Sequence, residues 1–165
     1  MIRPLFPPHF APALAQVIHT DQESLLKYPL IASFKEDGER AFSQPNGFYS
    51  RKLLRIPNRQ VNQFAQAKLA ANLDGELMAW TANDLDLSNY GCEGTQHMEP
   101  QTFPRISSWL STEYAYCERW SFNVFDCINH PQWTYVDRLK ELSDIIGNYN
   151  DPRIRLIPQM LCNSW

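Results

Sequence analysis

Residues 35–40 read Lys-Glu-Asp-Gly-Glu-Arg and place an amine, three carboxylates, a glycine and a guanidinium within six positions. A lysine at the end of a buried strand loses hydration, which lowers its pKa and makes some of the amine nucleophilic. The glycine allows close backbone approach to a phosphate, and the arginine can clamp a ribose or phosphate. These groups suit attack on an α-phosphate to give a lysyl-nucleotide adduct, with Mg²⁺ and cationic side chains stabilising the developing charge.

The same six residues also fit a charged hairpin turn. Asp37-Gly38 is a common dipeptide of tight turns, because glycine tolerates positive φ, and the flanking charges would then be solvated. The short stretch alone favours this simpler interpretation.

The elements that would position these residues are mixed. Two helices are expected: Val61, Phe64, Ala65 and Leu69 share one face of a helix in 59–73, and Thr134 with Asp137 forms a capping box for a second helix that Gly147 ends. Pro45-Asn46-Gly47 is a hairpin turn. Strands are expected at 29–35, 40–44, 47–51, 73–80, 119–128 and 153–159, and short helical patterns at 11–28. The fold class is therefore α+β, with mixed, largely antiparallel sheets and flanking helices.

Four segments in this order resemble the motifs of ATP-dependent DNA ligases, within the covalent nucleotidyltransferases. Lys35, Asp37, Gly38 and Arg40 match K-x-D-G-x-R, and Ser50-Arg51 is similar to the next ligase motif. The third is Asp74-Gly75-Glu76, and the aromatic fourth is Phe125-Asp126. The stretch 50–59 looks particularly like small phage ligases. The resemblance covers the chain from about residue 25 and implies an incomplete nucleotidyltransferase (adenylation) domain.

The resemblance also implies roles for individual residues. Lys35 would be the nucleophile adenylated by ATP, and Ser33 would lie by the adenine edge. Arg40 and Glu76 would hold the ribose and the reacting groups, Phe125 would stack on the adenine, and Glu76 would also hold a Mg²⁺-bound water. The simpler interpretations are a core position for Phe125 and a surface position for Glu76.

A basic stretch follows the second motif. Arg51, Lys52, Arg55 and Arg59 place four cations within nine residues. Such stretches are usually solvated, but beside ligase motifs this one indicates a surface that follows the phosphates of DNA. By the resemblance, Arg51 would grip the 5′-phosphate of a nick in duplex DNA, with Lys52 and Arg55 beside it.

Two later motifs of the family, E-G-x-x-x-R and K-x-K, do not follow Asp126 in residues 127–165, and we expect no OB domain. Glu36 also departs from the family, which usually has an apolar or aromatic residue there. We expect residues 1–165 to form one such domain that stops early, so that a second chain could carry the missing motifs. The alternatives are a non-catalytic remnant that binds nucleic acid or a partner, and an RNA ligase or capping-type nucleotidyltransferase.

Composition sets outer limits on these functions. The net charge of −3 argues against a chain that coats nucleic acid by bulk charge, while leaving room for a local basic patch. No apolar run approaches a membrane span and no signal peptide is evident, so we expect no membrane partner and a cytoplasmic protein of a bacterial or phage-infected cell, acting in DNA repair or replication. The four cysteines form no CxxC pair and the four histidines are scattered, which predicts structural thiols rather than a zinc site.

Overall fold

The fold is α+β and is built on two sheets, as the sequence predicts. The computed structural model describes residues 6, 10, 19–69, 72–80 and 101–164. A short 3-10 helix, η1 (Thr20–Leu25), leads into β1 (Leu30–Ser33). The remaining elements, in chain order, are β2 (Glu39–Gln44), β3 (Gly47–Ser50), α1 (Arg59–Lys68), β4 (Leu73–Trp80), α2 (Phe103–Ser111), β5 (Arg119–Cys127), α3 (Tyr135–Gly147), β6 (Ile154–Leu156) and β7 (Gln159–Cys162).

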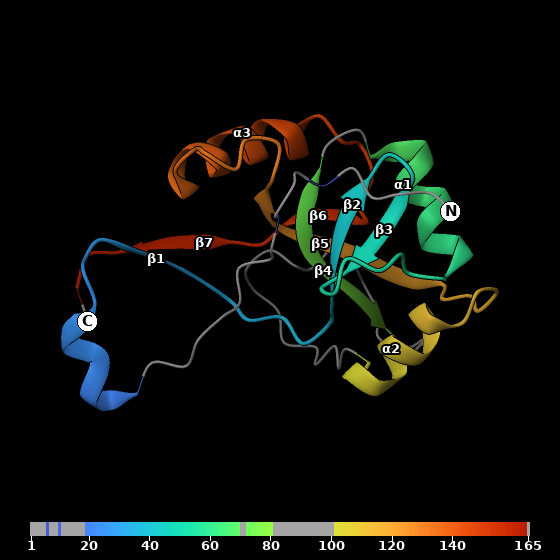
Figure 1. The fold of residues 1–165 in the computed structure, drawn as a ribbon, viewed down its shortest axis with the longest axis horizontal. Coiled ribbons are helices and arrows are strands. Elements are labelled where there is room, and N and C mark those ends of the chain that lie inside the picture. Colours follow the sequence, from blue (N-terminus) through green and yellow to red (C-terminus); the bar gives the residue numbers. More distant parts are fainter. Residues whose placement is uncertain (1–5, 7–9, 11–18, 70–71, 81–100, 165) are drawn as a thin grey trace.

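The larger sheet has five strands in the order β3-β2-β4-β5-β6, and the smaller one joins β1 to β7. All pairings are antiparallel except β5–β6, which is parallel. Figure 1 shows the β1–β7 pair projecting as an arm from the body that the larger sheet forms. The chain passes from the arm to the body through residues 34–38, which include the lysine motif, and the end of β6 leads back to the arm.

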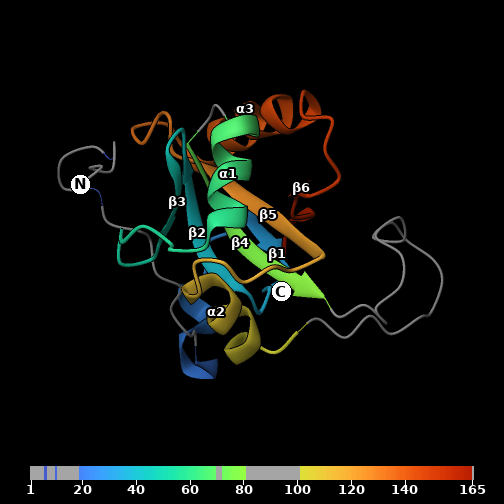
Figure 2. The same ribbon diagram turned by 90° about the vertical axis from the view of Figure 1, so that its right-hand side faces the viewer.

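One face of the larger sheet carries the apolar core. α1 packs against β3 and β2, α2 against β2 and β4, and α3 against β5 and β6. Figure 2 shows α1 lying across this sheet. Fully buried side chains from strands and helices join in one cluster, which includes Phe48, Val61, Leu77, Ile106, Trp120, Phe122 and Leu142. Each such side chain contributes about 1.5–3 kcal/mol through removal of apolar surface from water.

The hairpin of β2 and β3 forms as predicted. Gln44 pairs with Gly47 across the turn, and Gly47 has a φ of 134°, which only glycine adopts readily. On the face of β2 opposite the core, Phe6 and Phe10 lie edge-on to the ring of Phe42, with centroid distances of 5.8 and 5.6 Å. This end of the sheet is thereby covered by aromatic rings.

Three expectations from the sequence need correction. The segment 153–159 is not one strand: it contains β6 and the first residue of β7, and these two strands belong to different sheets. The expected helix over 59–73 ends at Lys68, because the chain must extend to enter β4 at Leu73. The helix α2 was not expected at all.

The predictions for β4 and for the start of α3 are confirmed. β4 spans 73–80 as predicted, and Thr134 accepts a hydrogen bond from the Asp137 backbone N–H at the start of α3. The helical patterns predicted at 11–28 include η1, but 11–18 lie outside the described residues, as do 81–100. None of the described helices has the length and apolar character needed to cross a bilayer. The described cysteines, Cys117, Cys127 and Cys162, are free thiols.

Candidate active site

A row of polar side chains crosses four strands on the face opposite the core. Arg40 on β2 pairs with Glu76 on β4, Glu76 pairs with Asn123 on β5, and Asn123 pairs with Arg155 on β6. Residues that are directly opposite each other in adjacent strands share one face of a sheet. Arg40, Glu76, Asn123 and Arg155 therefore lie side by side, and we call the face that carries them the polar face.

Arg40 is fixed in place by a bidentate ion pair. Its Nε donates to Asp74 Oδ1 at 3.0 Å and its Nη2 to Asp74 Oδ2 at 2.7 Å. The guanidinium carbon also lies 5.3 Å from the ring centre of Phe42 and 5.4 Å from that of Phe125. Burial raises the pKa of Asp74 to about 6, although the hydrogen bonds from Arg40 act in the opposite direction. The structure thus brings Arg40, Asp74 and Phe125 together, from three separate motifs.

Phe125 sits at an irregularity in β5. Asp74 pairs with Asp126 and Gly75 with Val124, so Phe125 is an extra residue without an opposite partner on β4. Such bulges redirect a side chain. The bulge is held from both sides, because the Tyr135 hydroxyl donates to the Phe125 carbonyl at 3.0 Å and Gln159 Nε2 approaches the same oxygen at 3.3 Å. Gln159 begins β7, so this contact ties the arm to the body.

Asp126 is engaged by α3 and not by the row. Arg138 donates from Nε and Nη2 to its two carboxylate oxygens at 2.8 and 2.9 Å. This pair anchors the start of α3 beside the bulge. Asp126 therefore supports the geometry of the site, and both of its carboxylate oxygens already accept hydrogen bonds from Arg138.

Glu76 is the carboxylate of the row with a strongly shifted pKa. Burial raises the pKa of Glu76 to about 7, and the positive charges of Arg40 and Lys35 oppose that shift. Asp74 and Glu36 raise it further. A carboxyl group that titrates near neutral pH is typical of functional sites, since it can accept or hold a proton.

Lys35 follows β1 at the point where the chain leaves the arm. Its side chain is 85% exposed, with Nζ at 3.8 Å from Asp37 Oδ1 and 3.4 Å from the Glu36 carbonyl oxygen. The expectation that a buried strand strips water from Lys35 is wrong in this structure, because β1 is only partly buried and the amine faces solvent. Activation of this amine would require a bound nucleotide or another segment to cover it.

The interpretation of residues 35–40 as a hairpin turn is wrong. β1 pairs with β7 and β2 pairs with β3 and β4, so the motif joins two different sheets and is not a turn between paired strands. Gly38 does not have a positive φ. A Cβ at Gly38 would instead lie within 3.0 Å of Met78, the Leu77 carbonyl and Glu76, so glycine is required for close packing on β4.

Glu36, which departs from the ligase motif, points toward the row. It is half-buried, and burial raises its pKa, while a hydrogen bond with Asn123 and the charge of Arg155 lower it. The residue after the lysine is thus a second carboxylate at the polar face, where the family usually has an apolar or aromatic side chain.

The basic stretch divides into two parts. Arg51 and Lys52 are exposed on a tight turn after β3, which a hydrogen bond of 2.8 Å from the Leu53 N–H to the Ser50 carbonyl closes. Arg55 forms an isolated antiparallel bridge with Tyr49, and its Nη2 donates to the Asn46 carbonyl at 3.2 Å. Ser33 ends β1, exposed and opposite Gln159 of β7. None of these residues joins the row on the polar face.

The described residues provide limited metal-binding capacity. They contain no cluster of three or more histidine, cysteine, aspartate or glutamate side chains suited to a metal ion. Asp74 and Asp126 are each held by an arginine, which leaves Glu76 and Glu36 at the row. One carboxylate with substrate phosphates and water is a usual arrangement for Mg²⁺. The site therefore fits an ion that arrives with a nucleotide better than a resident metal.

Sequence reasoning missed Asn123 and Arg155. Both signals were present, because Asn123 is a polar residue that alternates with Phe122 and Val124 on a predicted strand, and Arg155 alternates with Ile154 and Leu156. Their position opposite Glu76 depends on the strand order, which alternation does not reveal.

The fold matches solved DNA ligase structures. A structure of a chlorella virus DNA ligase-adenylate superimposes with a TM-score of 0.67 and 22% identity, covering 94% of this chain and 50% of that one. A second structure of that ligase-adenylate gives 0.63 at 20% identity, with coverage of 90% and 48%. A Lig E DNA ligase gives 0.57 at 20% identity, with coverage of 81% and 45%.

No family model and no curated protein sequence matches the chain. At these identities the structural likeness establishes the fold, which is that of the nucleotidyltransferase domain of a DNA ligase. The chain spans about half the length of the ligase structures that it matches.

Proposed function

We propose that this chain is the adenylation portion of an ATP-dependent DNA ligase, in which Lys35 carries AMP on its way to a 5′-phosphate. The observation that supports this most is the convergence on the polar face. Arg40, Glu76 and Phe125 come from motifs far apart in the sequence and lie around one ion pair, at the end of the segment that carries Lys35.

The proposed chemistry begins at the lysine amine. The Nζ lone pair of Lys35 attacks the α-phosphorus of ATP, the bond to the β-phosphate oxygen breaks, pyrophosphate leaves, and the amine loses its proton to solvent. AMP then passes from the lysine to the 5′-phosphate at a nick, and the neighbouring 3′-hydroxyl displaces AMP to seal the strand. Each step exchanges one oxygen or nitrogen for another at phosphorus and needs no oxidant or reductant.

The row positions the nucleotide in this proposal. Phe125 offers its ring to the adenine face, and Ser33 lies at the adenine edge. Arg40, already oriented by Asp74, donates to the ribose or the phosphate, and Glu76 accepts from a ribose hydroxyl when it is ionised. Mg²⁺ bound with the nucleotide would neutralise phosphate charge, and Glu76 would hold it through water.

The DNA contacts are assigned to the exposed cations beyond β3. Arg51 would grip the 5′-phosphate of nicked duplex DNA, and Lys52 and Arg55 would contact the neighbouring backbone. Contacts of this type carry no sequence preference, as a nick-sealing enzyme requires.

In this proposal, residues 1–165 form a single nucleotidyltransferase unit. The later cationic motif of the family is missing from them, and phosphoryl transfer depends strongly on positioned positive charge. We therefore expect adenylation by these residues alone to be slow. A further segment or second chain with E-G-x-x-x-R and K-x-K would raise the rate.

The test is nick sealing with matched substrates. The purified chain and its Lys35→Ala variant are incubated with ATP, Mg²⁺ and duplexes nicked in a DNA strand or an RNA strand, and transfer of radiolabelled AMP is followed. Transfer to the 5′-phosphate of the DNA nick by the unsubstituted protein, and not by Lys35→Ala, is expected.

Other outcomes would replace the proposal. Transfer confined to the RNA nick would indicate an RNA ligase, and labelling from GTP in place of ATP would indicate a capping-type enzyme. Binding of the duplex by both proteins, without any transfer, would indicate a non-catalytic module.

A further inference from the structure

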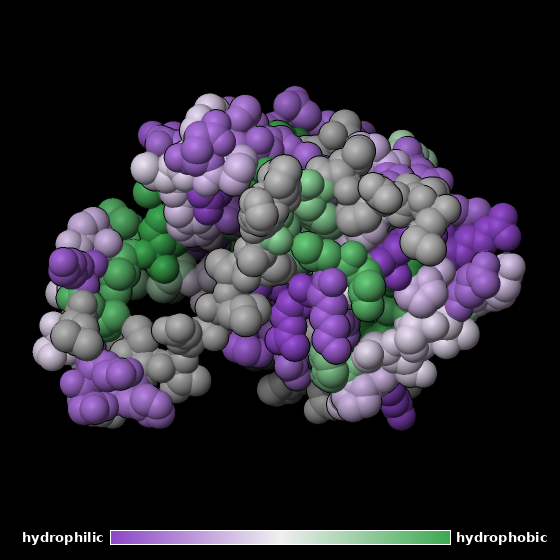
Figure 3. Space-filling view, in the orientation of Figure 1, coloured by the Kyte–Doolittle hydropathy of each residue, from purple (hydrophilic) through white to green (hydrophobic). Residues whose placement is uncertain are grey.

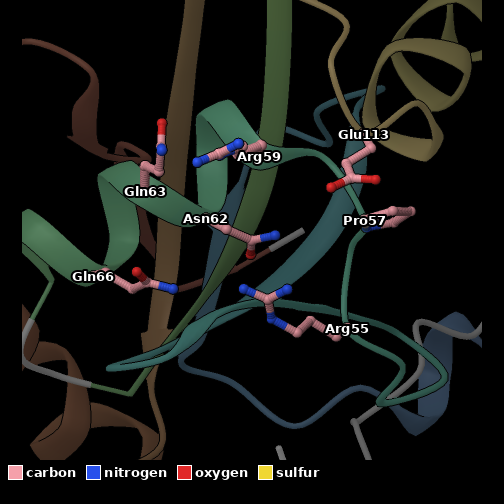
Figure 4. A pocket seen from close by; sticks show the side chains of 7 residues that line it. All are labelled: Arg55, Pro57, Arg59, Asn62, Gln63, Gln66 and Glu113. Carbon is pink, nitrogen blue, oxygen red and sulfur yellow. The ribbon is translucent and has the colours of Figure 1, made fainter. Parts of the chain in front are cut away.

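A polar cavity of about 300 Å³ lies where the basic stretch meets α1, away from the row on the polar face. Figure 4 shows its lining side chains arranged around a common opening. They are Arg55, Pro57, Arg59, Asn62, Gln63, Gln66 and Glu113, and we call this cavity the α1 pocket. Guanidinium and amide groups dominate it, and no aromatic or aliphatic side chain except Pro57 contributes.

The frame of the α1 pocket is rigid because two buried asparagines hold it. Asn62 accepts from the Phe48 N–H at 2.8 Å and donates to the Ile56 and Asn58 carbonyls at 2.7 and 2.8 Å. Asn58 donates to the carbonyls of Trp109, Thr112 and Ala115 at 2.9–3.0 Å. The β3–α1 loop and the loop after α2 are thereby locked together, and Glu113 is fixed on one side of the pocket.

The donors that line the pocket are not all in use. Gln66 and Arg55 each donate one N–H to the Asn46 carbonyl at 3.2 Å, which fixes the Arg55 side chain with N–H groups to spare. Among the residues that the structure describes, the Arg59 guanidinium has neither a hydrogen-bond nor an ion-pair partner. Two guanidinium charges face one carboxylate, that of Glu113, so the pocket has a net positive charge.

Two exposed tyrosines follow Glu113 in the chain. Tyr114, which follows Glu113, is 74% exposed and Tyr116 is 76% exposed, on a loop that the Asn58 hydrogen bonds hold still. Arginine, glutamine and tyrosine side chains are common donors to the phosphate and sugar oxygens of DNA. A positively charged pocket rich in donors, with exposed tyrosines on the segment that follows Glu113, therefore favours a polynucleotide backbone as the occupant.

We propose that the α1 pocket binds a phosphodiester of the DNA backbone through Arg59, Arg55 and Gln63, with Tyr114 contacting the adjoining sugar. The proposal rests on the proposed function and extends the DNA contact surface from the turn at Arg51 along the start of α1. Arg55 serves as the link between the two parts, since it belongs both to the basic stretch and to the pocket.

Equilibrium binding of a nicked duplex, followed by fluorescence anisotropy over a range of salt concentrations, tests this inference. Arg59→Ala should weaken binding roughly tenfold, the worth of one hydrogen bond to a charged group. It should also reduce the slope of log K against log[salt] by about 0.9, the value for one lost phosphate contact. Arg105→Ala, which removes an exposed arginine of α2 outside the pocket, is the matched control and should change neither quantity.

Glu113→Gln provides a gain of binding that misfolding cannot imitate. Removal of the pocket's carboxylate should tighten DNA binding severalfold and leave the slope unchanged or steeper. Equal affinities for Arg59→Ala and Arg105→Ala would overturn the inference, as would weaker binding by Glu113→Gln.

The failure of this inference can be told apart from failure of the proposed function. AMP transfer is measured on the same proteins, and transfer together with indifference of DNA binding to Arg59 would overturn only the pocket assignment. Titration with inorganic phosphate at constant ionic strength tests whether the pocket binds a small phosphate ion in place of the DNA backbone. Arg59-dependent phosphate binding without any effect on the duplex would assign the pocket to a small anion and overturn the inference.

Discussion

Two cations, Arg40 and Lys35, lower the pKa of Glu76, and yet Glu76 holds its proton more tightly than an ordinary glutamate. Burial on the polar face outweighs Arg40 and Lys35 and brings the pKa of Glu76 to about 7, from 4.5. The folded state therefore binds this proton more strongly than the unfolded state does. Linkage then gives stabilisation that is complete below about pH 4.5 and is lost as the pH rises to about 7.

The first prediction is that Glu76→Gln flattens this loss. Glutamine keeps the shape of the side chain without a charge to desolvate, so at pH 8 the variant should be more stable than the parent by on the order of 1 kcal/mol, reduced from the full shift because the group is partly exposed. Denaturant unfolding between pH 4.5 and 8 measures it. Glu118→Gln, an exposed acid at the start of β5, should follow the parent, and a Glu76→Gln profile identical to the parent would refute the burial of this carboxyl.

In Glu76→Gln, the free energy of unfolding should still decrease somewhat as the pH rises. The pKa of Asp74 is also raised by burial, to about 6, so its contribution has the same sign between about pH 4 and 6. The double variant is unsuitable as a control, because Asp74 holds Arg40 by two hydrogen bonds.

At the scale of single elements, packing against β4 decides where the lysine motif lies. Gly38 passes over β4 so closely that a methyl group would meet Met78 and the Leu77 carbonyl. The second prediction is that Gly38→Ala destabilises the protein by about 1–3 kcal/mol, as overpacking does, and shifts the segment that carries Lys35 away from β4. Thermal unfolding measures the stability.

Gly147→Ala is the matched control for Gly38→Ala. A Cβ at Gly147 meets nothing within 4 Å at the end of α3, so alanine should leave the melting temperature unchanged or slightly higher. Equal effects of the two substitutions would contradict the close approach of residue 38 to β4.

Asn58 joins α1 to the loop after α2. Its side chain caps α1 by accepting from the Val61 N–H and satisfies three carbonyls of residues 109–115. The third prediction is that Asn58→Ala costs roughly 2–4 kcal/mol, the sum of a lost cap and buried carbonyls left unpaired. Asn58→Asp should fall between, because it keeps the cap and loses the donors.

Urea unfolding of these variants gives the free energies. Asn148→Ala removes an exposed side chain that donates to a single carbonyl, Asp144, and should cost under about 1 kcal/mol. A loss for Asn58→Ala no larger than that for Asn148→Ala would contradict the role given to Asn58.

The elements that sequence reasoning found are those with strong local signals. β4 is an eight-residue run that ends in four apolar residues, the hairpin has Pro-Asn-Gly, and α3 has a capping box. The helix α2 was missed because its sequence, Phe103–Ser111, is short and rich in serine, and it gains stability from burial of Ile106, Trp109 and Leu110. The split of 153–159 into β6 and β7 was missed because only the tertiary partners, β5 and β1, distinguish one strand from two.

In the whole molecule, the two sheets position different parts of the proposed site. The row of polar side chains lies on the body, and β1 of the arm ends two residues before Lys35 (Figure 1). Figure 3 shows apolar side chains gathered on the arm, and Phe34, Met160 and Leu161 there are largely exposed. A pair of two strands is marginally stable by itself, so the tie from Gln159 to the Phe125 carbonyl is an important support for its position.

The site residues were identified through the resemblance to ligase motifs, whereas their environment is known only from the fold. The resemblance implied that Arg40, Glu76 and Phe125 contact one nucleotide, and the structure places Arg40 opposite Glu76 and near the ring of Phe125. Desolvation of Lys35 was predicted from an apolar run, but burial depends on what covers a strand, and β1 has only β7 beside it among the described strands.

The central claim, that Lys35 takes up AMP, is tested most directly by intact-mass spectrometry after incubation with ATP and Mg²⁺. The account predicts an AMP-sized mass gain in a fraction of the unsubstituted chain, with the adduct mapped to the peptide that contains Lys35, and no gain in Lys35→Ala. No gain in a chain shown to be folded by circular dichroism, or an equal gain in Lys35→Ala, would contradict it.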